Sequence, residues 1–213
     1  MIENKAYLSV VSPVYLAEGI IDELVKRITE EVSKITEDYE IILVEDGSPD
    51  KSWNKIKENC ENDNRVKGIK LSRNFGQHYA VTAGLKESVG EYVVIIDCDL
   101  QENPKSIHKL MDKAKEGNDI VLTIHKKREH GILKTYFSKI YHRVFNLLVG
   151  NKNLQSGEQY GALSLLKRKV VQAFSEFNDY HRHYLAVIRW LGFQRAEIKV
   201  LHQKRFIGKS SYS

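Results

Sequence analysis

The sequence contains little cysteine and little proline, and it has no long hydrophobic run. Of its 213 residues, two are cysteine and three are proline. Two cysteines are too few for a disulfide framework, which favours a reducing compartment. The most apolar segments, at residues 41–44 and 92–96, have the length of strands, far short of the roughly 18–20 residues that a membrane helix needs. The sequence therefore predicts no membrane-spanning helix within this chain.

The overall composition is that of an ordinary folded domain. Hydrophobic residues make up 42% and charged residues 29%, which excludes a disordered or collagen-like chain. The formal net charge of +5 would suit an anionic partner such as a nucleotide sugar, a lipid phosphate or a membrane surface. No recognised nucleic-acid-binding motif accompanies this modest charge, so nucleic-acid binding is not expected. We expect one domain over residues 1–213, and the charged Glu3 and Lys5 do not resemble a signal peptide.

The first half of the chain alternates apolar, strand-like runs with helical patterns. Strands are expected over residues 7–11, 40–44, 66–71, 92–96 and 119–124. Helices are expected over residues 18–35, 51–60, 78–88 and about 107–114. Strands that are apolar throughout, such as residues 41–44, require cover on both faces of their sheet. The sequence thus predicts an α/β protein with a mostly parallel central sheet flanked by helices.

The second half of the chain is less regular. Residues 151–161 have the composition of a loop, helices are expected over residues 169–177 and 183–191, and a late strand over residues 196–201. Residues 132–149 form a basic, aromatic helical pattern that follows Lys126, Lys127 and Arg128. This segment could meet a phosphorylated lipid at a membrane surface, or it could be a core helix with solvated lysines.

All three prolines fall just past the ends of predicted strands. Pro13, Pro49 and Pro104 share their loops with polar or acidic residues. In open α/β sheets, ligands bind at the carboxyl ends of the strands. These loops are therefore expected to converge on one ligand-binding rim.

The strongest local signal is the sequence DCDLQ at residues 97–101, directly after a predicted strand. Asp97 and Asp99 can both turn toward one ligand where the chain leaves the sheet, and their oxygens suit Mg²⁺ or Mn²⁺ bridged to phosphates. The amide oxygen of Gln101 could be a further ligand. A solvated acidic turn is the alternative, but the position after a buried strand favours the metal site.

Two further loops carry candidate binding residues. Asp46, in the sequence EDGSPD at residues 45–50, could hydrogen-bond a base or a ribose, or it could form an Asx-type turn. Arg73, in the sequence SRNFGQ at residues 72–77, lies at a helix start, where backbone N–H groups favour an anion, although a simple helix cap is equally compatible. The next residue along, His78, is interpreted as a surface or packing histidine rather than a ligand.

Five short motifs in order resemble the family 2 glycosyltransferases. They are SPVY at residues 12–15, VEDGS at 44–48, SRNFGQ at 72–77, DCDLQ at 97–101 and RFIGKSSYS at 205–213. The chain is most similar to the branch that resembles dolichol- and polyprenyl-phosphate sugar transferases, and the resemblance covers essentially its whole length. It implies a GT-A fold, with a nucleotide-binding half at residues 1–125 and an acceptor-side half at residues 126–213.

The resemblance also implies roles for individual positions. Three residues would hold the nucleoside: Pro13, Tyr15 and Asp46. Three would hold a metal ion and the diphosphate: Asp97, Asp99 and Gln101. Arg205 and Lys209 would face the phosphates of donor or acceptor, and Asp99 with its metal and Arg205 would stabilise the leaving group. Glu18 is a displaced substitute for the acidic residue usual in the first loop. The hydrogen-bond donors and the glycine of residues 205–213 favour a flap that closes over the donor diphosphate, with a frayed basic tail as the alternative.

The acceptor decides whether the reaction needs a general base. A sugar hydroxyl must lose a proton to a carboxylate, whereas a phosphate monoester, with a second pKa of about 6, is already largely ionised at neutral pH. The acidic residue often found before the second-half Tyr-Gly pair is replaced here by Gln159, with Glu158 one position earlier. This favours a phosphate acceptor or Glu158 as the base. Asp179 is a third candidate base, with a helix cap as the alternative.

The expected protein is therefore an inverting glycosyltransferase with Mg²⁺ or Mn²⁺ as cofactor. It would move a sugar from a UDP- or GDP-linked donor to a polyprenyl phosphate or a glycan in cell-envelope polysaccharide or glycolipid synthesis, in the cytoplasm at the inner face of the cytoplasmic membrane. A sugar nucleotidyltransferase is one alternative, but it should carry a glycine-rich basic loop after the first strand, where this chain has SPVYLA at residues 12–17. A non-catalytic nucleotide-sugar or glycan-binding module is the other, and Asp97 and Asp99 argue against it.

Overall fold

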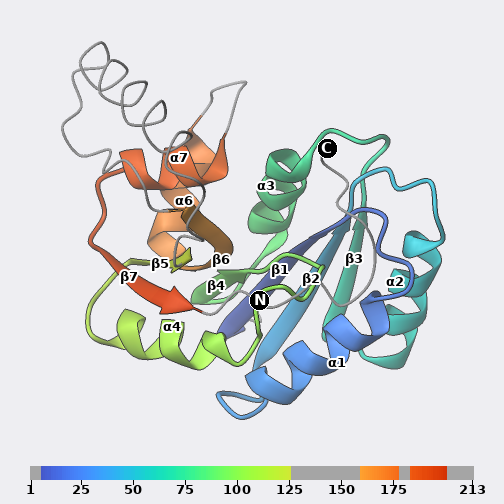
Figure 1. Cartoon of the computed structure of the whole chain (residues 1–213), viewed down its shortest axis with the longest axis horizontal. Coiled ribbons are helices and arrows are strands. Elements are labelled where there is room, and N and C mark those ends of the chain that lie inside the picture. The colour runs from blue at the N-terminus through green and yellow to red at the C-terminus, as the bar shows by residue number, and fades with distance from the viewer. Residues whose placement is uncertain (1–5, 126–158, 178–182, 201–213) are drawn as a thin grey trace, which may run out of the picture.

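The computed structural model describes residues 6–125, 159–177 and 183–200. A seven-stranded sheet forms the centre of the fold (Figure 1). Its strands are β1 (Leu8–Val14), β2 (Tyr39–Glu45), β3 (Val66–Lys70), β4 (Tyr92–Ile95), β5 (Ile120–His125), β6 (Gln159–Lys167) and β7 (Arg195–Val200). The described helices are α1 (Ile21–Val32), α2 (Ser52–Asn62), α3 (Gln77–Glu87), α4 (Ser106–Lys115), α6 (Arg168–Glu176) and α7 (Tyr184–Trp190).

The strand order confirms the predicted α/β class and the mostly parallel sheet. The order is β3-β2-β1-β4-β6-β5-β7. Neighbouring strands run parallel except at β6, which is antiparallel to both β4 and β5. The expected strands and helices of the first half are all present, with ends shifted by up to three residues.

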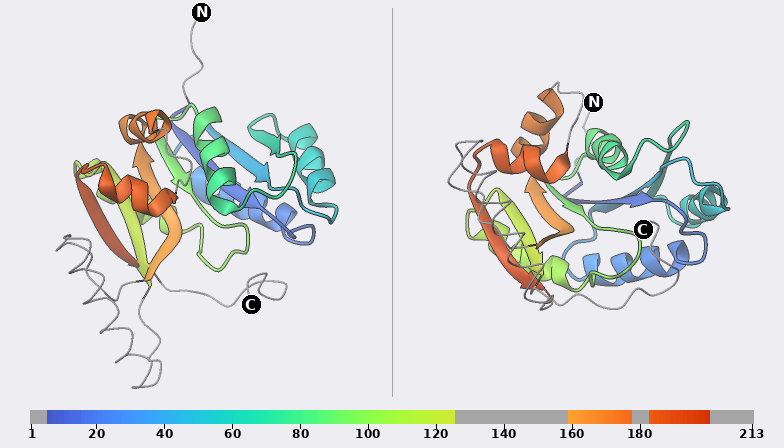
Figure 2. Two further views of the ribbon diagram at one scale, coloured as in Figure 1. Left: turned by 90° about the horizontal axis from the view of Figure 1, so that it is seen from above. Right: turned by 45° about the horizontal axis from the view of Figure 1, so that its top comes forward.

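Helices cover both faces of the sheet, as the apolar strands require. Helices α1, α2 and α4 pack against one face, and α3, α6 and α7 pack against the other, as Figure 1 and the right view of Figure 2 show. Adjacent residues of β1 show the division, because Val10 belongs to the first core cluster and Val11 to the second. Close packing also explains a glycine in α3, since a Cβ atom on Gly84 would lie 2.3 Å from Cγ1 of Val11.

Two expectations about strands are wrong. The loop predicted over residues 151–161 is wrong at residues 159–161, because β6 begins at Gln159 and fills the position between β4 and β5; residues 151–158 lie outside the described residues. The stability of β6 comes from two partner strands that lie far away in the sequence. Pro13 was expected past the end of the first strand, but it lies buried inside β1. A proline is tolerated there because its nitrogen faces the side of β4, and β1 pairs with β4 only as far as Val11.

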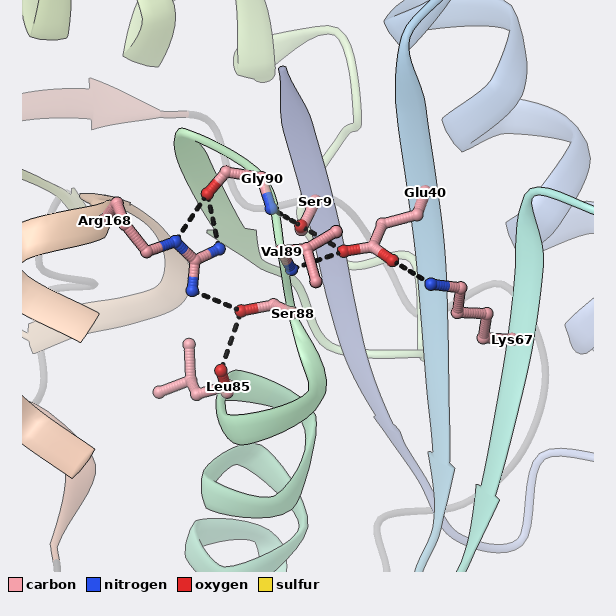
Figure 3. A network of polar contacts seen from close by, with 8 residues as sticks. All are labelled: Ser9, Glu40, Lys67, Leu85, Ser88, Val89, Gly90 and Arg168. Carbon is pink, nitrogen blue, oxygen red and sulfur yellow. Dashed lines mark hydrogen bonds and ion pairs between the residues drawn. The ribbon is translucent and has the colours of Figure 1, made fainter. Parts of the chain in front are cut away.

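A polar network links β1, β2 and β3 to the start of α6 at the amino ends of these strands (Figure 3). Arg168 Nε donates to the carbonyl of Gly90 at 2.8 Å, and the Gly90 N–H donates to Ser9 Oγ at 2.8 Å. Ser9 in turn donates to Glu40 Oε1 at 2.5 Å, and Lys67 Nζ lies 2.7 Å from Glu40 Oε2. Burial opposes the ionisation of Glu40, but its hydrogen bonds outweigh this effect and lower its pKa below the usual value.

Candidate functional site

The loops that follow β1 and β2 bind each other at the carboxyl ends of the strands. The Leu16 N–H donates to Ser48 Oγ at 2.9 Å. The Glu18 N–H donates to Asp50 Oδ2 at 3.1 Å, and the Glu18 carboxylate accepts the Lys51 N–H at 3.1 Å. Burial opposes the ionisation of Asp50, but hydrogen bonds, from Ser48 first, lower its pKa. The Glu18 carboxylate thus holds the start of α2 in this structure.

The loop after β2 is joined in the same way to the loop after β3. Asp46 is 3% exposed, and its Oδ1 and Oδ2 accept the backbone N–H groups of Phe75 and Gly76 at 2.8 and 2.9 Å. Gly47 has a φ of +61°, and a Cβ atom there would lie 2.3 Å from the carbonyl carbon of Arg73. Only glycine fits this position. Asp46 therefore accepts hydrogen bonds from backbone N–H groups, as the Asx-turn interpretation expected. These groups belong to the loop after β3, however, and not to the turn that contains Asp46.

The loop after β4 carries the two candidate metal ligands. The Gln77 amide donates to Asp97 Oδ1 at 2.5 Å, and Asp99 Oδ1 accepts the Gln101 N–H at 3.0 Å. Asp97, Asp99 and Gln101 are all partly exposed at the rim. Gln77 begins α3, so this contact also connects the loop after β4 with the loop after β3.

The thiol between the two aspartates closes the ring of loop contacts. Cys98 accepts a hydrogen bond from the backbone of Tyr15, in the loop after β1. Burial, with the charges of Asp97 and Asp99, raises the pKa of this thiol to about 12. Cys98 is therefore neutral near pH 7 and does not act as a thiolate nucleophile.

The carboxylates at the rim fit a divalent ion that arrives with a phosphorylated ligand. Among residues 6–125, 159–177 and 183–200, no group of three or more His, Cys, Asp or Glu side chains is arranged to hold a metal. Mg²⁺ at nucleotide sites is commonly held by one or two carboxylates together with substrate phosphates. Asp97 and Asp99, with the amide of Gln101, supply that kind of oxygen set.

The structure describes some of the remaining candidate residues, and the others lie outside the described ranges. Tyr15 is partly exposed beside Cys98, and Arg73 is exposed, with its guanidinium carbon 4.1 Å from the ring centroid of Phe75. His78 packs against His183 with ring centroids 4.1 Å apart, and burial, aided by His183, lowers its pKa. Several predictions fall outside the described residues: Glu158, Asp179, Arg205, Lys209, the basic run at 126–128, the helix at 132–149 and the flap at 205–213.

One residue that the sequence reasoning missed lies beneath the acidic loop. Glu102 is 4% exposed, and its Oε2 accepts the Leu163 N–H at 2.6 Å. Burial, with the charge of Asp99, raises the pKa of Glu102 despite these hydrogen bonds. The only signal in the sequence was an acidic residue directly after Gln101, and nothing local distinguishes a buried acid from a solvated one.

Comparison with known proteins connects this rim to a family. The family model described as "Glycosyl transferase family 2" matches residues 9–175. The chain is 37% identical over 214 residues to the undecaprenyl-phosphate 4-deoxy-4-formamido-L-arabinose transferase of Shewanella sediminis, covering 99% of this chain and 63% of the relative. It is 32% identical over 215 residues to the protein of the same name from Pectobacterium atrosepticum, covering 100% of this chain and 64% of the relative. The chain thus spans less than two thirds of the length of these relatives.

Solved structures show the same fold. A mannosyltransferase from Pyrobaculum calidifontis, in complex with GDP-Man and Mn²⁺, aligns with a TM-score of 0.64 at 16% identity over 98% of this chain and 59% of its own. Glucosyl-3-phosphoglycerate synthase from Mycobacterium tuberculosis, in complex with Mn²⁺, UDP and phosphoglyceric acid, aligns with a TM-score of 0.63 at 16% identity over 94% of this chain and 72% of its own. The predicted GT-A fold is therefore confirmed. Within the described ranges, no helix is long and apolar enough to cross a membrane.

Proposed function

Because this chain belongs to glycosyl transferase family 2, we propose that it is an inverting glycosyltransferase that moves a sugar from a UDP- or GDP-linked donor to a polyprenyl phosphate. One observation carries the proposal. The four loops after β1, β2, β3 and β4 bind one another in a closed ring, and this ring brings Tyr15, Asp46, Asp97 and Asp99 to one edge of the sheet. That edge is where α/β sheets bind nucleotides.

In the donor site, each loop has a separate task. Tyr15, with the backbone around Pro13, borders the nucleoside, and Asp46 orders the loop that presents Arg73. Asp97, Asp99 and Gln101 would face the diphosphate and would hold Mg²⁺ or Mn²⁺; the bound ion would supply positive charge to neutralise the leaving nucleoside diphosphate. As the C-terminal motif implies, Arg205 and Lys209 would add positive charge toward the donor or acceptor phosphates.

A phosphate acceptor agrees best with the residues at hand. An acceptor phosphate is largely dianionic at neutral pH, because its second pKa is about 6, and it can attack the anomeric carbon without a strong base. Two relatives are named as undecaprenyl-phosphate sugar transferases, which favours a polyprenyl phosphate over a glycan. Glu158 and Asp179 are the candidate bases if the acceptor is a sugar hydroxyl.

Such a reaction belongs to cell-envelope polysaccharide or glycolipid synthesis. A polyprenyl phosphate lies in a membrane, and nucleotide sugars are cytoplasmic, so we place the reaction at the inner face of the cytoplasmic membrane. The net charge of +5 favours contact with anionic lipid headgroups there.

The proposal is tested in two stages. A panel of UDP- and GDP-sugars is first screened for Mn²⁺-dependent thermal stabilisation of the protein. The best donor is then incubated with a short polyprenyl phosphate or with an oligosaccharide, and the anomeric configuration of the product is determined. We expect an inverted glycosyl polyprenyl phosphate. Binding without transfer would indicate a binding module, and release of pyrophosphate from a nucleoside triphosphate and a sugar phosphate would indicate a nucleotidyltransferase.

A further inference from the structure

The acidic loop after β4 reverses direction so that one of its carboxylates turns into the protein. Leu100 has a φ of 56° and is 2% exposed. A left-handed conformation is unfavourable for a non-glycine residue, and the burial of the Leu100 side chain offsets this cost. Glu102, two residues later, is 4% exposed, while Asp97 and Asp99 stay at the rim.

Glu102 binds two strands of the sheet at once. Its Oε2 accepts the Leu163 N–H at 2.6 Å, in β6. Its Oε1 lies 3.0 Å from Oγ1 of Thr123, in β5, and the same hydroxyl lies 2.7 Å from the Leu163 carbonyl oxygen. The carboxyl and the hydroxyl together therefore satisfy both backbone groups of Leu163.

The need for these contacts arises from a break in the pairing of β5 with β6. Leu122 pairs with Ser164, and the next pair is Ile124 with Tyr160, so residues 161–163 of β6 stand opposite Thr123 alone. A bulge of this kind removes backbone groups from the ladder, and buried backbone groups must find other partners. Glu102 supplies the acceptor for the Leu163 N–H group of this bulge.

We propose that Glu102 is a positioning residue for the donor site, an inference that rests on the proposed function. By binding the β5–β6 bulge, Glu102 anchors the end of the acidic loop against the sheet. Gln101 is its direct neighbour, and the bond of 3.0 Å from the Gln101 N–H to Asp99 Oδ1 extends this constraint to Asp99. Glu102 does not touch the donor itself. It determines where the oxygens of Asp99 and Gln101 meet the diphosphate and its metal.

Two substitutions of Glu102 separate its hydrogen bonds from its charge. Glu102→Ala leaves the Leu163 N–H without an acceptor. Glu102→Gln retains an oxygen that accepts this N–H, and its amide group can donate to the Thr123 hydroxyl, which then donates to the Leu163 carbonyl. We expect Glu102→Ala to weaken Mn²⁺-dependent binding of UDP or GDP by about 10- to 100-fold, as the loss of residues that orient metal ligands commonly does. Glu102→Gln should bind with an affinity close to that of the wild type.

The measurements are calorimetric affinity with Mn²⁺, the melting temperature, and hydrogen exchange of the Leu163 amide. Tyr184→Phe is the matched control. It removes a buried hydroxyl that hydrogen-bonds Ser164 at 2.7 Å; Ser164 lies in β6, next to Leu163, but Tyr184 belongs to the core cluster on the opposite face of the sheet. This substitution should lower the melting temperature and leave the affinity unchanged. If Glu102→Ala does not fold, Thr123→Val decides the question, because it removes the hydroxyl that binds Glu102 and Leu163, and it should also weaken binding.

Several results would overturn this role of Glu102. One such result is wild-type affinity in Glu102→Ala or, if that variant is unfolded, in Thr123→Val. This result would leave the proposed function standing. Equal loss of affinity in Glu102→Gln and Glu102→Ala would show that the hydrogen bonds are not what matters. An equal loss in Tyr184→Phe would show a general effect of stability. A wild-type protein that binds neither UDP nor GDP would contradict the proposed function itself, and the role of Glu102 with it.

Discussion

Asp46→Asn tests whether the ring of loops depends on a buried carboxylate. In the wild type, each oxygen of Asp46 accepts one backbone N–H, from Phe75 and from Gly76. Asparagine offers only one oxygen, so its amide group must face the second N–H, and two donors then oppose each other. The substitution is nearly isosteric, which leaves the packing around Gly47 unchanged and isolates the hydrogen bond.

The expected loss of stability follows from burial. Asp46 is 3% exposed, so water cannot replace the lost acceptor. An unsatisfied buried donor costs roughly 1–3 kcal/mol, and we take about 2 kcal/mol. For a domain of this size, 1 kcal/mol shifts the melting temperature by about 2–4 °C, so the expected decrease is about 4–8 °C.

Differential scanning calorimetry measures this decrease, with Asp112→Asn as the control. Asp112 is exposed on α4, and its substitution should change the free energy of unfolding by less than about 0.5 kcal/mol. A melting temperature of Asp46→Asn within about 1 °C of the control would refute the reasoning. It would mean that the loops after β2 and β3 are held together without the carboxylate.

Three further predictions concern the rim and the polar network at the opposite edge of the sheet. Asp99→Ala should reduce turnover about 100- to 1,000-fold while the melting temperature stays close to that of the wild type, because Asp99 is partly exposed; full activity in a donor-hydrolysis assay would contradict this. Glu40 has a pKa below its usual 4.5, so the stability it contributes is complete above about pH 4.5 and is lost as the pH falls through the lowered pKa. Urea unfolding of Glu40→Gln between pH 3 and 7 should therefore show a flatter acid dependence than the wild type, and parallel curves would refute the assignment. Arg168→Lys should destabilise the protein by about 1–2 kcal/mol in urea, because lysine cannot donate two N–H groups to Gly90 and one to Ser88; an unchanged midpoint would count against the network.

The periodicity of apolar residues determined most of the fold. Positions such as Ile21, Leu24 and Ile28 recur at helical spacing and are all fully buried in α1. The apolar run of β2 is buried along its whole length. These patterns are local, because a side chain's direction in a helix or strand depends only on its position in that element. The α/β class, the five strands of the first half and the helices between them could therefore be predicted from the chain alone.

The motifs in the sequence likewise indicated the family and the edge of the sheet where a ligand would bind. Asp97 and Asp99 follow a strand directly, so their position at its carboxyl end needed no tertiary information. Their roles toward a donor stay predictions, as do those of Glu158, Asp179, Arg205 and Lys209. What the sequence could not indicate is which side chains bind the loops together, because Gln77 and Asp97 are 20 positions apart and Asp46 and Gly76 are 30 apart.

Only the tertiary structure decided the features that depend on pairing between distant segments. It placed β6 between β4 and β5, where two partners stabilise a strand that the local pattern did not reveal. It placed Pro13 inside β1, because β4 ends where the missing N–H would have been needed. It buried Glu102 against Leu163, 61 positions later in the chain. Local spacing predicts which face of an element is apolar, but the partner of a buried carboxylate is determined only when the strands come together.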